Sequence, residues 1–590
     1  MAPPRLFPAP RHVELQGAGV ASDVAPTWHH ESGLPAEGFT IRVGDGAIRV
    51  TYADDAGRRH AGDVLAQLGR QHRERLPGLV IRDWPDFPVR GYLLDVSRDR
   101  VPTRATLARL VDLLARCRLN HFQLYVEHAF AYRDHEIVWR DASPLTPEDL
   151  RWLDARCRAR GIELAANQNG FGHMERWLRH DRYRPLAECP DGWTTSFGAP
   201  MPPAVLAPSD DALAFVLALY RELAACVESR RINIGCDETF ELGRGRHRDA
   251  VERHGRGRVY LDFLRRQIDA LQAGGHEVLF WADVLRGHPE LLPELPTTDA
   301  VALCWHYEAP RTASDLPPWV EELMAEFGMR PDDLRGFAAQ VPPFAEHGAP
   351  FWVCPGTSTW NSLLGRLPNA RANVDDAASV GLAYGAGGLL ITDWGDNGHH
   401  QPPTVSVPAI VYGAAQAWCH ESNRDVALAD VVDEFVFDDE AGELGRALEL
   451  AGSVYDRTGL VPMNGSPLHQ QLLTAGLGQL GKLLGAADAG GVRRTLDALE
   501  EARCGVERSR PRCEDGSTIR RELLCAIRLA RHGAWRIARG AGLPAPDVAV
   551  LRRDLDEAID EQRACWRLRS REGGLADSVA RLEATRREYD

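Results

Sequence analysis

The strongest constraint on the fold of this chain is an alternation of short apolar runs with amphipathic helical stretches between residues 87 and 425. Helical stretches such as Thr103–Cys117, Pro147–Arg160, Asp211–Val227 and Val259–Gly274 separate the runs. Strand-then-helix alternation of this kind predicts a parallel sheet, and about eight repeats favour closure into a (β/α)8 TIM barrel. A doubly wound open sheet is the alternative, but no Gly-rich nucleotide loop opens any of these helices. The expected strands are Gly91–Val96, His121–Val126, Ile162–Ala166, Ile232–Cys236, Val278–Ala282, Val301–His306, Phe351–Cys354 and Gly388–Thr392.

A small α/β domain is expected before the barrel, in residues 1–86. Phe39–Val43 and Ala47–Tyr52 alternate apolar and polar residues around Gly44-Asp45-Gly46, the pattern of a β-hairpin. Apolar residues at helical spacing follow, from Val64 to Leu68. The prolines of the segment 83–88 disfavour helix and predict the boundary with the barrel domain, residues 87–425.

The remainder, residues 426–590, predicts a helical domain without strands. The stretch Trp566–Ser578 is expected either to pack back on the barrel or to form a homodimer contact. Apolar residues recur at helical spacing in two runs, Leu472, Leu477, Leu480 and Leu484, and Ile519, Leu523, Leu524 and Ile527.

Composition excludes several classes of protein. The net charge of −15 repels nucleic acid. No stretch approaches the ~20 apolar residues of a membrane-spanning helix, and the proline-rich start cannot act as a secretory signal. The 12 cysteines are scattered singly, without metal-ligand spacing, and predict a reduced, cytoplasmic protein with no metal and no cofactor.

Polar and aromatic side chains gather at the carboxyl ends of the expected strands, the face where barrel enzymes build their active sites. Sugars need carboxylates and amides for their hydroxyls and aromatic surfaces for their C–H faces. Cleaving a glycosidic bond normally requires two carboxyl groups, and Asp237-Glu238 ends the fourth strand. We therefore expect catalysis at Asp237 and Glu238, with binding residues among Glu127, Asn167, His173, Trp281, Trp305, Tyr307, Trp394 and Asp396.

Each of these residues also has an ordinary structural interpretation. An Asp-Glu pair at a strand-to-helix junction is usually a helix cap, and a Trp on a barrel strand usually packs between layers. Cys236 is expected to be a small buried residue rather than a nucleophile. The pair His399-His400 is expected in a solvated loop rather than at a metal.

At these residues the sequence resembles glycoside hydrolase family 20, the β-N-acetylhexosaminidases, over roughly the first seven-tenths of the chain. The segment 83–98 is similar to the family's entry into the first strand, and by that match Arg90 resembles the arginine that binds sugar hydroxyls. Residues 233–238, Asn-Ile-Gly-Cys-Asp-Glu, are similar to the family's His-x-Gly-Gly-Asp-Glu signature. Phe280–Asp283 and Asp393–Asp396 resemble its fifth- and eighth-strand motifs.

The resemblance implies substrate-assisted catalysis on an amino-sugar-terminated oligosaccharide or glycoconjugate. The sugar's 2-acetamido oxygen would attack the anomeric carbon, with Glu238 as acid and base and Asp237 orienting the acetamide. Arg90 and Asp396 would hold the outer hydroxyls, which makes the pocket exo-acting.

The chain departs from the family pattern at strand seven, where a tyrosine usually binds the acetamido oxygen. Here that region contains Trp360 and no tyrosine, so Trp360 joins the candidate binding residues, and Tyr307 or another side chain would take the tyrosine's role. Two alternatives therefore stay open. One is a related hydrolase that releases disaccharides or cleaves non-acetylated glucosaminides, and the other is a non-catalytic sugar-binding barrel.

Overall fold

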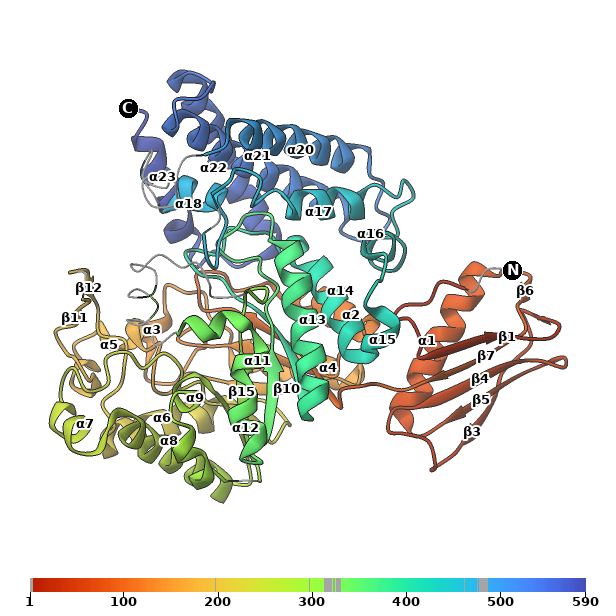
Figure 1. The fold of residues 1–590 in the computed structure, drawn as a ribbon, viewed down its shortest axis with the longest axis horizontal. Coiled ribbons are helices and arrows are strands. Elements are labelled where there is room, and N and C mark those ends of the chain that lie inside the picture. Colours follow the sequence, from red (N-terminus) through yellow and green to blue (C-terminus); the bar gives the residue numbers. More distant parts are fainter. Residues whose placement is uncertain are drawn as a thin grey trace.

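The computed structural model describes residues 4–196, 198–296, 298–311, 321, 324, 330–460, 462–474, 476 and 487–590. The described chain forms three units, as the sequence predicts (Figure 1). An N-terminal sheet with one long helix (red) lies beside the barrel, and a group of C-terminal helices (blue) lies across another side of it.

The N-terminal unit is a five-stranded sheet with the order β1-β7-β4-β5-β3. The predicted hairpin joins β4 and β5, and its two turn residues, Asp45 and Gly46, have φ of 51° and 72°, as a tight hairpin turn requires. The helix α1 (Asp55–Gln71) buries Val64 and Leu68 against the sheet. The strands are β1 (His12–Leu15), β3 (Thr27–His30), β4 (Phe39–Gly44), β5 (Ala47–Tyr52) and β7 (Leu79–Asp83), with β2 (Val20–Ala21) and β6 (Arg75–Leu76) paired separately.

Eight parallel strands close into a barrel, and each coincides with a predicted strand to within a few residues. Neighbouring strands follow chain order around the barrel, with β17 closing on β8 through the register Gly388↔Val89 to Asp393↔Leu94. The strands are β8 (Val89–Asp95), β9 (His121–Tyr125), β10 (Glu163–Asn167), β13 (Arg231–Asn233), β14 (Glu277–Trp281), β15 (Ala300–Trp305), β16 (Phe351–Cys354) and β17 (Gly388–Asp393).

The helices around the barrel begin at side-chain caps that the sequence provides. Thr103, Thr146 and Ser209 each accept a backbone N–H of the first helical turn, which satisfies a donor that the helix itself cannot. In the described residues after the fifth and sixth strands the helices are short, as in α9 (Asp283–Arg286) and α11 (Phe337–Gln340). The main barrel helices are α2 (Arg104–Arg116), α4 (Pro147–Ala159), α6 (Asp210–Ala224), α8 (Arg256–Ala273), α13 (Leu367–Tyr384) and α14 (Val407–Trp418).

The C-terminal unit is helical in its described part, as predicted. The apolar run Ile519–Ile527 lies on α21, whereas Leu477, Leu480 and Leu484 lie outside the described residues. No helix in the described ranges has the length and apolarity needed to cross a membrane. The helices include α17 (Leu444–Gly452), α18 (Pro467–Leu473), α20 (Ala489–Arg508), α21 (Gly516–Gly540), α22 (Val548–Arg569) and α23 (Leu575–Arg587).

The junction between α22 and α23 packs back on the barrel, the first of the two alternatives for this stretch. Trp566 is fully buried with the Arg100 guanidinium 4.8 Å above its ring, and the Arg571 N–H donates to the Val101 carbonyl. The expectation that His399 and His400 lie in a solvated loop is wrong. Both side chains are buried, because α23 covers this loop and a ring nitrogen of His400 lies 3.0 Å from the Ser578 carbonyl oxygen.

The opposite end of the barrel carries a buried ion pair between the barrel and the N-terminal unit. Arg90, at the start of β8, is fully buried and donates from both amino groups to the Glu37 carboxylate at 2.7 and 3.1 Å. Burial raises the pKa of Glu37, but the hydrogen bond with His60 and the Arg90 charge outweigh it and lower the pKa to about 2. Charge pairing therefore joins the two units at this end.

We predict that Glu37→Gln lowers the free energy of unfolding of this part of the chain by about 3 kcal/mol, since it leaves a buried guanidinium without its counter-charge. A depressed carboxyl pKa stabilises the fold above its unfolded value near 4.3, and this contribution is lost as the pH falls toward 2. The difference in free energy of unfolding between Glu37→Gln and wild type, measured by urea unfolding, should therefore become smaller as the pH falls. Glu31→Gln, at an exposed position in the same unit, is the control; equal effects of the two variants would contradict the assignment.

Candidate active site

A pocket of about 800 Å³ opens at the carboxyl ends of the barrel strands. Side chains at or after the carboxyl end of each of the eight strands contribute to its lining. Met463 and Asn464, from the C-terminal unit, add to one wall. The arrangement concentrates carboxylates, arginines, histidines and several aromatic rings on one cavity, in the place where barrel enzymes bind substrates.

The end of the fourth strand turns two consecutive carboxylates into this pocket. Cys236 and Glu238 have φ of 70° and 48°, a left-handed conformation that costs a residue other than glycine ~1–3 kcal/mol. A Cβ on Gly172 would lie 2.1 Å from the Asp237 carbonyl oxygen, so this close approach of two loops requires glycine. Asp237 and Glu238 therefore escape the alternation of a regular strand, and both line the pocket.

His173 lies between these two carboxylates. Its Nε2 is 3.2 Å from Asp237 Oδ2 and 3.4 Å from Glu238 Oε2. Burial lowers the pKa of His173, but the neighbouring charges, Asp237 foremost, outweigh it and raise the pKa to about 10. At neutral pH the ring is therefore an imidazolium that holds the carboxylate pair in place.

A third carboxylate, Asp283, supports Glu238 from the end of the fifth strand. Its Oδ2 accepts the Glu238 backbone N–H at 3.0 Å, while its Oδ1 is buried and has no partner within the described chain. Burial and the nearby charge of Asp237 raise the pKa of Asp283. Enclosure in the pocket likewise raises the pKa of Glu238, with Asp237 adding to the shift and His173 opposing it. A carboxyl group with a raised pKa can donate a proton at neutral pH.

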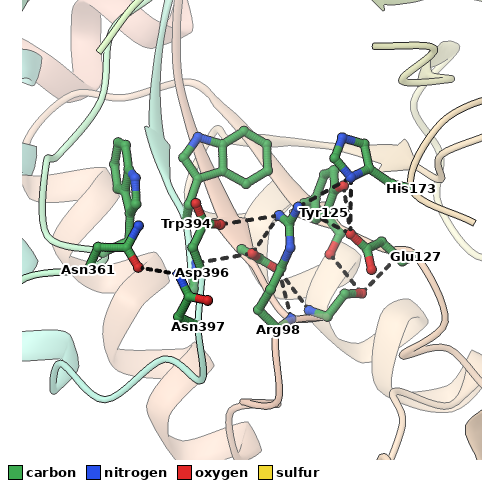
Figure 2. A network of polar contacts seen from close by, with 12 residues as sticks. Arg98, Tyr125, Glu127, His173, Asn361, Trp394, Asp396 and Asn397 are labelled. Atoms are coloured by element: carbon green, nitrogen blue, oxygen red, sulfur yellow. Dashed lines mark hydrogen bonds and ion pairs between the residues drawn. The ribbon is translucent and has the colours of Figure 1, made fainter. Parts of the chain in front are cut away.

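Arg98 organises a network of polar contacts on the Nδ1 side of His173 (Figure 2). Its guanidinium lies 2.9 Å from Asp95 Oδ2, 3.3 Å from Glu127 Oε1 and 3.9 Å from Asp396 Oδ1. It also lies over two aromatic rings, 4.9 Å from the centre of Tyr125 and 5.3 Å from that of Trp394. The Arg98 guanidinium can donate hydrogen bonds to sugar hydroxyl groups, and the carboxylates around it can accept hydrogen bonds from them.

Aromatic side chains form the remaining walls. Trp305 stacks on Tyr307 with ring centres 5.1 Å apart, and Tyr307 meets the edge of Trp360 at 5.1 Å. Trp281 lies 5.9 Å from Trp394, and the indole N–H groups of Trp281 and Trp305 are buried without a partner in the described residues. The Trp360 N–H, in contrast, donates to Asn464 Oδ1. These walls offer apolar faces together with unused donors.

The structure brings most of the predicted site residues together. Besides Asp237 and Glu238, the pocket lining or the Arg98 network contains Glu127, His173, Trp281, Trp305, Tyr307, Trp360, Trp394 and Asp396.

Two predicted binding residues lie elsewhere, and these predictions are corrected. Arg90 is at the opposite end of β8, where Glu37 occupies its guanidinium. Asn167 points into the barrel interior, because it is the last residue of β10, and its amide donates to Gln123 Oε1 at 2.9 Å. Gln123 also accepts from Asn233, so Asn167 belongs to a buried polar layer below the pocket.

Sequence reasoning missed Arg98, Asp283 and Asn464. Arg98 follows the first strand within the matched segment, and Asp283 ends the fifth-strand motif, so position at a strand end was the available signal for both. Nothing in the sequence links Asn464, more than 100 residues after strand seven, to Trp360. Cys236 is buried and its pKa is raised well above the ordinary thiol value by burial, as expected of a structural residue. The described residues contain no group of three or more side chains arranged to hold a metal ion.

Comparison with known families assigns the two N-terminal units. Residues 87–316 match the catalytic domain of glycosyl hydrolase family 20, and residues 5–84 match domain 2 of the same family. The two matches together span more than half of the chain, so the chain belongs to glycosyl hydrolase family 20.

Individual relatives are distant. The mouse β-hexosaminidase subunit beta is 24% identical over 268 residues, 42% of this chain and 49% of that protein. Human hexosaminidase D is 26% identical over 211 residues, 35% of this chain and 41% of that protein. The chain thus spans about half the length of the curated relatives it matches or less.

Solved structures extend the similarity in fold. A β-N-acetylhexosaminidase structure has a TM-score of 0.56 at 17% identity, covering 74% of this chain and 96% of that one. A chitobiase from Flavobacterium johnsoniae has a TM-score of 0.55 at 14% identity and covers 98% of this chain and 99% of that one. The second likeness includes the C-terminal helices.

We predict that Asp237→Asn lowers the pKa of His173 from about 10 toward its ordinary value, because the variant removes the nearest negative charge. The pKa is measured by NMR of protein labelled at histidine. Asp249→Asn, at an exposed position on a neighbouring helix, should leave it unchanged. An unchanged His173 pKa in Asp237→Asn would show that another group holds the imidazolium.

Proposed function

We propose that this chain is an exo-acting β-N-acetylhexosaminidase that hydrolyses terminal β-linked GlcNAc or GalNAc with retained configuration. The observation that carries the proposal is the pair Asp237-Glu238, held on one imidazolium that lies between these carboxylates and Arg98. The Arg98 network offers polar groups to the outer hydroxyls of a terminal sugar, which favours a chain terminus over the middle of a polymer. Membership of the family supports the substrate class.

Glu238 is the proposed acid and base. Its raised pKa keeps a proton available for the leaving oxygen as the glycosidic bond breaks. The side chain is 38% exposed in the open pocket, so a glycosidic oxygen can reach it. In the second half-reaction the Glu238 carboxylate takes a proton from the water that attacks the anomeric carbon.

Asp237 is the proposed partner of the substrate's acetamide. The acetamido oxygen attacks the anomeric carbon and forms an oxazolinium ion, whose positive charge the Asp237 carboxylate stabilises. His173 binds only Oδ2, whereas the buried Oδ1 has no partner in the described chain and can accept the acetamide N–H. The Asp237 carboxylate already contacts the His173 imidazolium and is therefore a poor nucleophile. This favours the substrate-assisted route over a covalent enzyme intermediate.

The remaining roles follow from position. Arg98, Glu127 and Asp396 would bind the outer hydroxyls of the terminal sugar, and Trp394 would stack against its ring. Strand seven supplies no tyrosine for the acetamido oxygen, so the unused indole N–H of Trp281 or Trp305 or the Tyr307 hydroxyl would take that role. The same departure motivates the alternatives of a non-acetylated glucosaminide or a released disaccharide. A cytoplasmic location and a homodimer stay predictions from the sequence.

We predict that Glu238→Gln lowers kcat on an aryl β-N-acetylglucosaminide with a poor leaving group by about 10³, and much less with an activated leaving group that needs no proton. Asp237→Asn should cost about 10²–10³ with both substrates. Glu252→Gln, the same change at an exposed position, is the matched control. A thiazoline mimic of the oxazolinium ion should inhibit the wild type.

Each alternative has its own outcome in this experiment. Turnover of aryl β-glucosaminide but of neither N-acetyl substrate would favour the non-acetylated alternative. Binding of N-acetylglucosamine without turnover of any glycoside would favour the sugar-binding barrel. Full activity in Glu238→Gln would remove the proposed acid.

We further predict that Asp283→Asn shifts the alkaline limb of the pH profile of kcat/KM to lower pH. The limb reports ionisation of Glu238, whose pKa is raised by burial and further by the charge of Asp237. The Glu238 and Asp283 carboxylates repel one another. Asparagine removes this repulsion while its side-chain oxygen still accepts the Glu238 N–H, so the Glu238 pKa falls. Asp283→Ala loses the acceptor as well and should also lower kcat. A limb that moves to higher pH in Asp283→Asn would contradict this account.

A further inference from the structure

Part of the pocket lining lies beside Glu238 but outside the Arg98 network, and we call this part the extension. Phe240, Val284 and Met201 line this extension together with Arg256 and His288. In the function proposed above, the Arg98 network binds the terminal sugar and Glu238 protonates the oxygen that leaves. The leaving group would therefore meet the extension, where Arg256 is anchored beside Glu238.

Arg256 differs from Arg98 and Arg286 in having no carboxylate of the described residues within ion-pair distance, although the charge of Asp283 acts on it from farther away. Arg98 is paired with Asp95 and Glu127, and Arg286 is paired with Asp333. Arg330 is exposed and therefore hydrated. Arg256 is half-buried, and no carboxylate of the described residues lies within ion-pair distance of it.

The contacts of Arg256 fix its guanidinium beside the proposed acid. It is the first residue of α8, and its Nη2 donates to the carbonyl oxygen of Thr239, the residue after Glu238, at 2.8 Å. Its Nε is buried without a partner, and its Nη1 has none among the described residues either. Burial lowers the pKa of Arg256, and the charge of Asp283 offsets only part of this shift. A half-buried guanidinium with unused donors is a recognition group for a planar carboxylate.

We propose that this extension is a leaving-group subsite for an acidic sugar, in which Arg256 binds the carboxylate of a uronic acid attached to the terminal amino sugar. The proposal rests on the function proposed above and names its substrate class. Phe240, Val284 and Met201 supply apolar surface for the C–H face of the second sugar, and Arg256 supplies the charge. Arg256 takes no part in bond breaking and acts on the choice of substrate.

The test compares two disaccharides that differ only in charge: a terminal β-N-acetylglucosamine linked to a uronic acid, and the methyl ester of the same compound. At low ionic strength the wild type should show a kcat/KM about tenfold higher for the acid than for the ester, the size expected of one hydrogen-bonded charge pair. Arg256→Gln should bring the ratio to about one, and Arg256→Lys should keep part of it. Arg253→Gln, at an exposed position three residues earlier, should retain the wild-type ratio.

A purely structural role of Arg256 would lower both rates and leave their ratio unchanged, so an unchanged ratio in Arg256→Gln overturns the proposal. A wild type that prefers the ester, or shows no preference, overturns it as well. Both results are distinct from failure of the proposed function, in which the wild type cleaves no aryl N-acetyl glycoside. In that case calorimetry with a uronic acid methyl glycoside decides: binding to wild type but not to Arg256→Gln supports the subsite, and equal or absent binding rejects it.

Discussion

The buried carboxylate of Asp95 is the contact on which the pocket depends. Its Oδ1 accepts the N–H groups of Ser97 and Arg98, and its Oδ2 accepts the Gly395 N–H at 3.0 Å and the Arg98 guanidinium at 2.9 Å. One side chain thus fixes the turn after the first strand and joins it to the loop after the eighth, where the barrel closes. Arg98 then faces Glu127 and Asp396, and His173 faces Asp237 and Glu238. Enclosure in this pocket raises the pKa of Glu238, and the charge of Asp237 adds to the shift while the His173 imidazolium opposes it. Glu238 therefore keeps its proton more readily than an isolated carboxyl group.

The barrel alone does not complete this arrangement, because the C-terminal helices hold the loop that carries Asp396. Ser578 on α23 donates to the Gly398 carbonyl, and its own carbonyl lies 3.0 Å from His400. Arg100, which lies against Trp566, donates to the Gln401 carbonyl of the same loop. A second segment of the C-terminal unit places Asn464 on the Trp360 N–H. Helices without catalytic motifs therefore act on the pocket by ordering two of its loops.

Periodicity predicted all eight strands, because buried parallel strands are continuous apolar runs that end in polar residues. The sequence pattern could not show which of Arg90 and Arg98 lies at the pocket, because both arginines belong to the same matched segment. Eight residues of extended chain span roughly 25 Å, so the wrong choice moves the side chain from one end of the barrel to the other. The prediction for Asn167 was wrong for a related reason. At the end of a strand, a side chain one residue earlier or later can point into the barrel interior instead of into the pocket. His400 and Asn464 depend on partners more than 100 residues away, and local sequence carries no record of such contacts.

The carboxylates around Glu238 also affect which leaving group can bind. A uronic acid beside Glu238 would add one more negative charge to a site that already holds Asp237 and Asp283. Without compensation that charge would oppose binding, although it would help Glu238 to retain its proton. Arg256, anchored on the Thr239 carbonyl, is the cation positioned to offset it without forming an ion pair with Glu238 itself. In these anionic surroundings a leaving-group subsite for a carboxylate would therefore require an arginine that forms no ion pair of its own, as Arg256 forms none with the described residues.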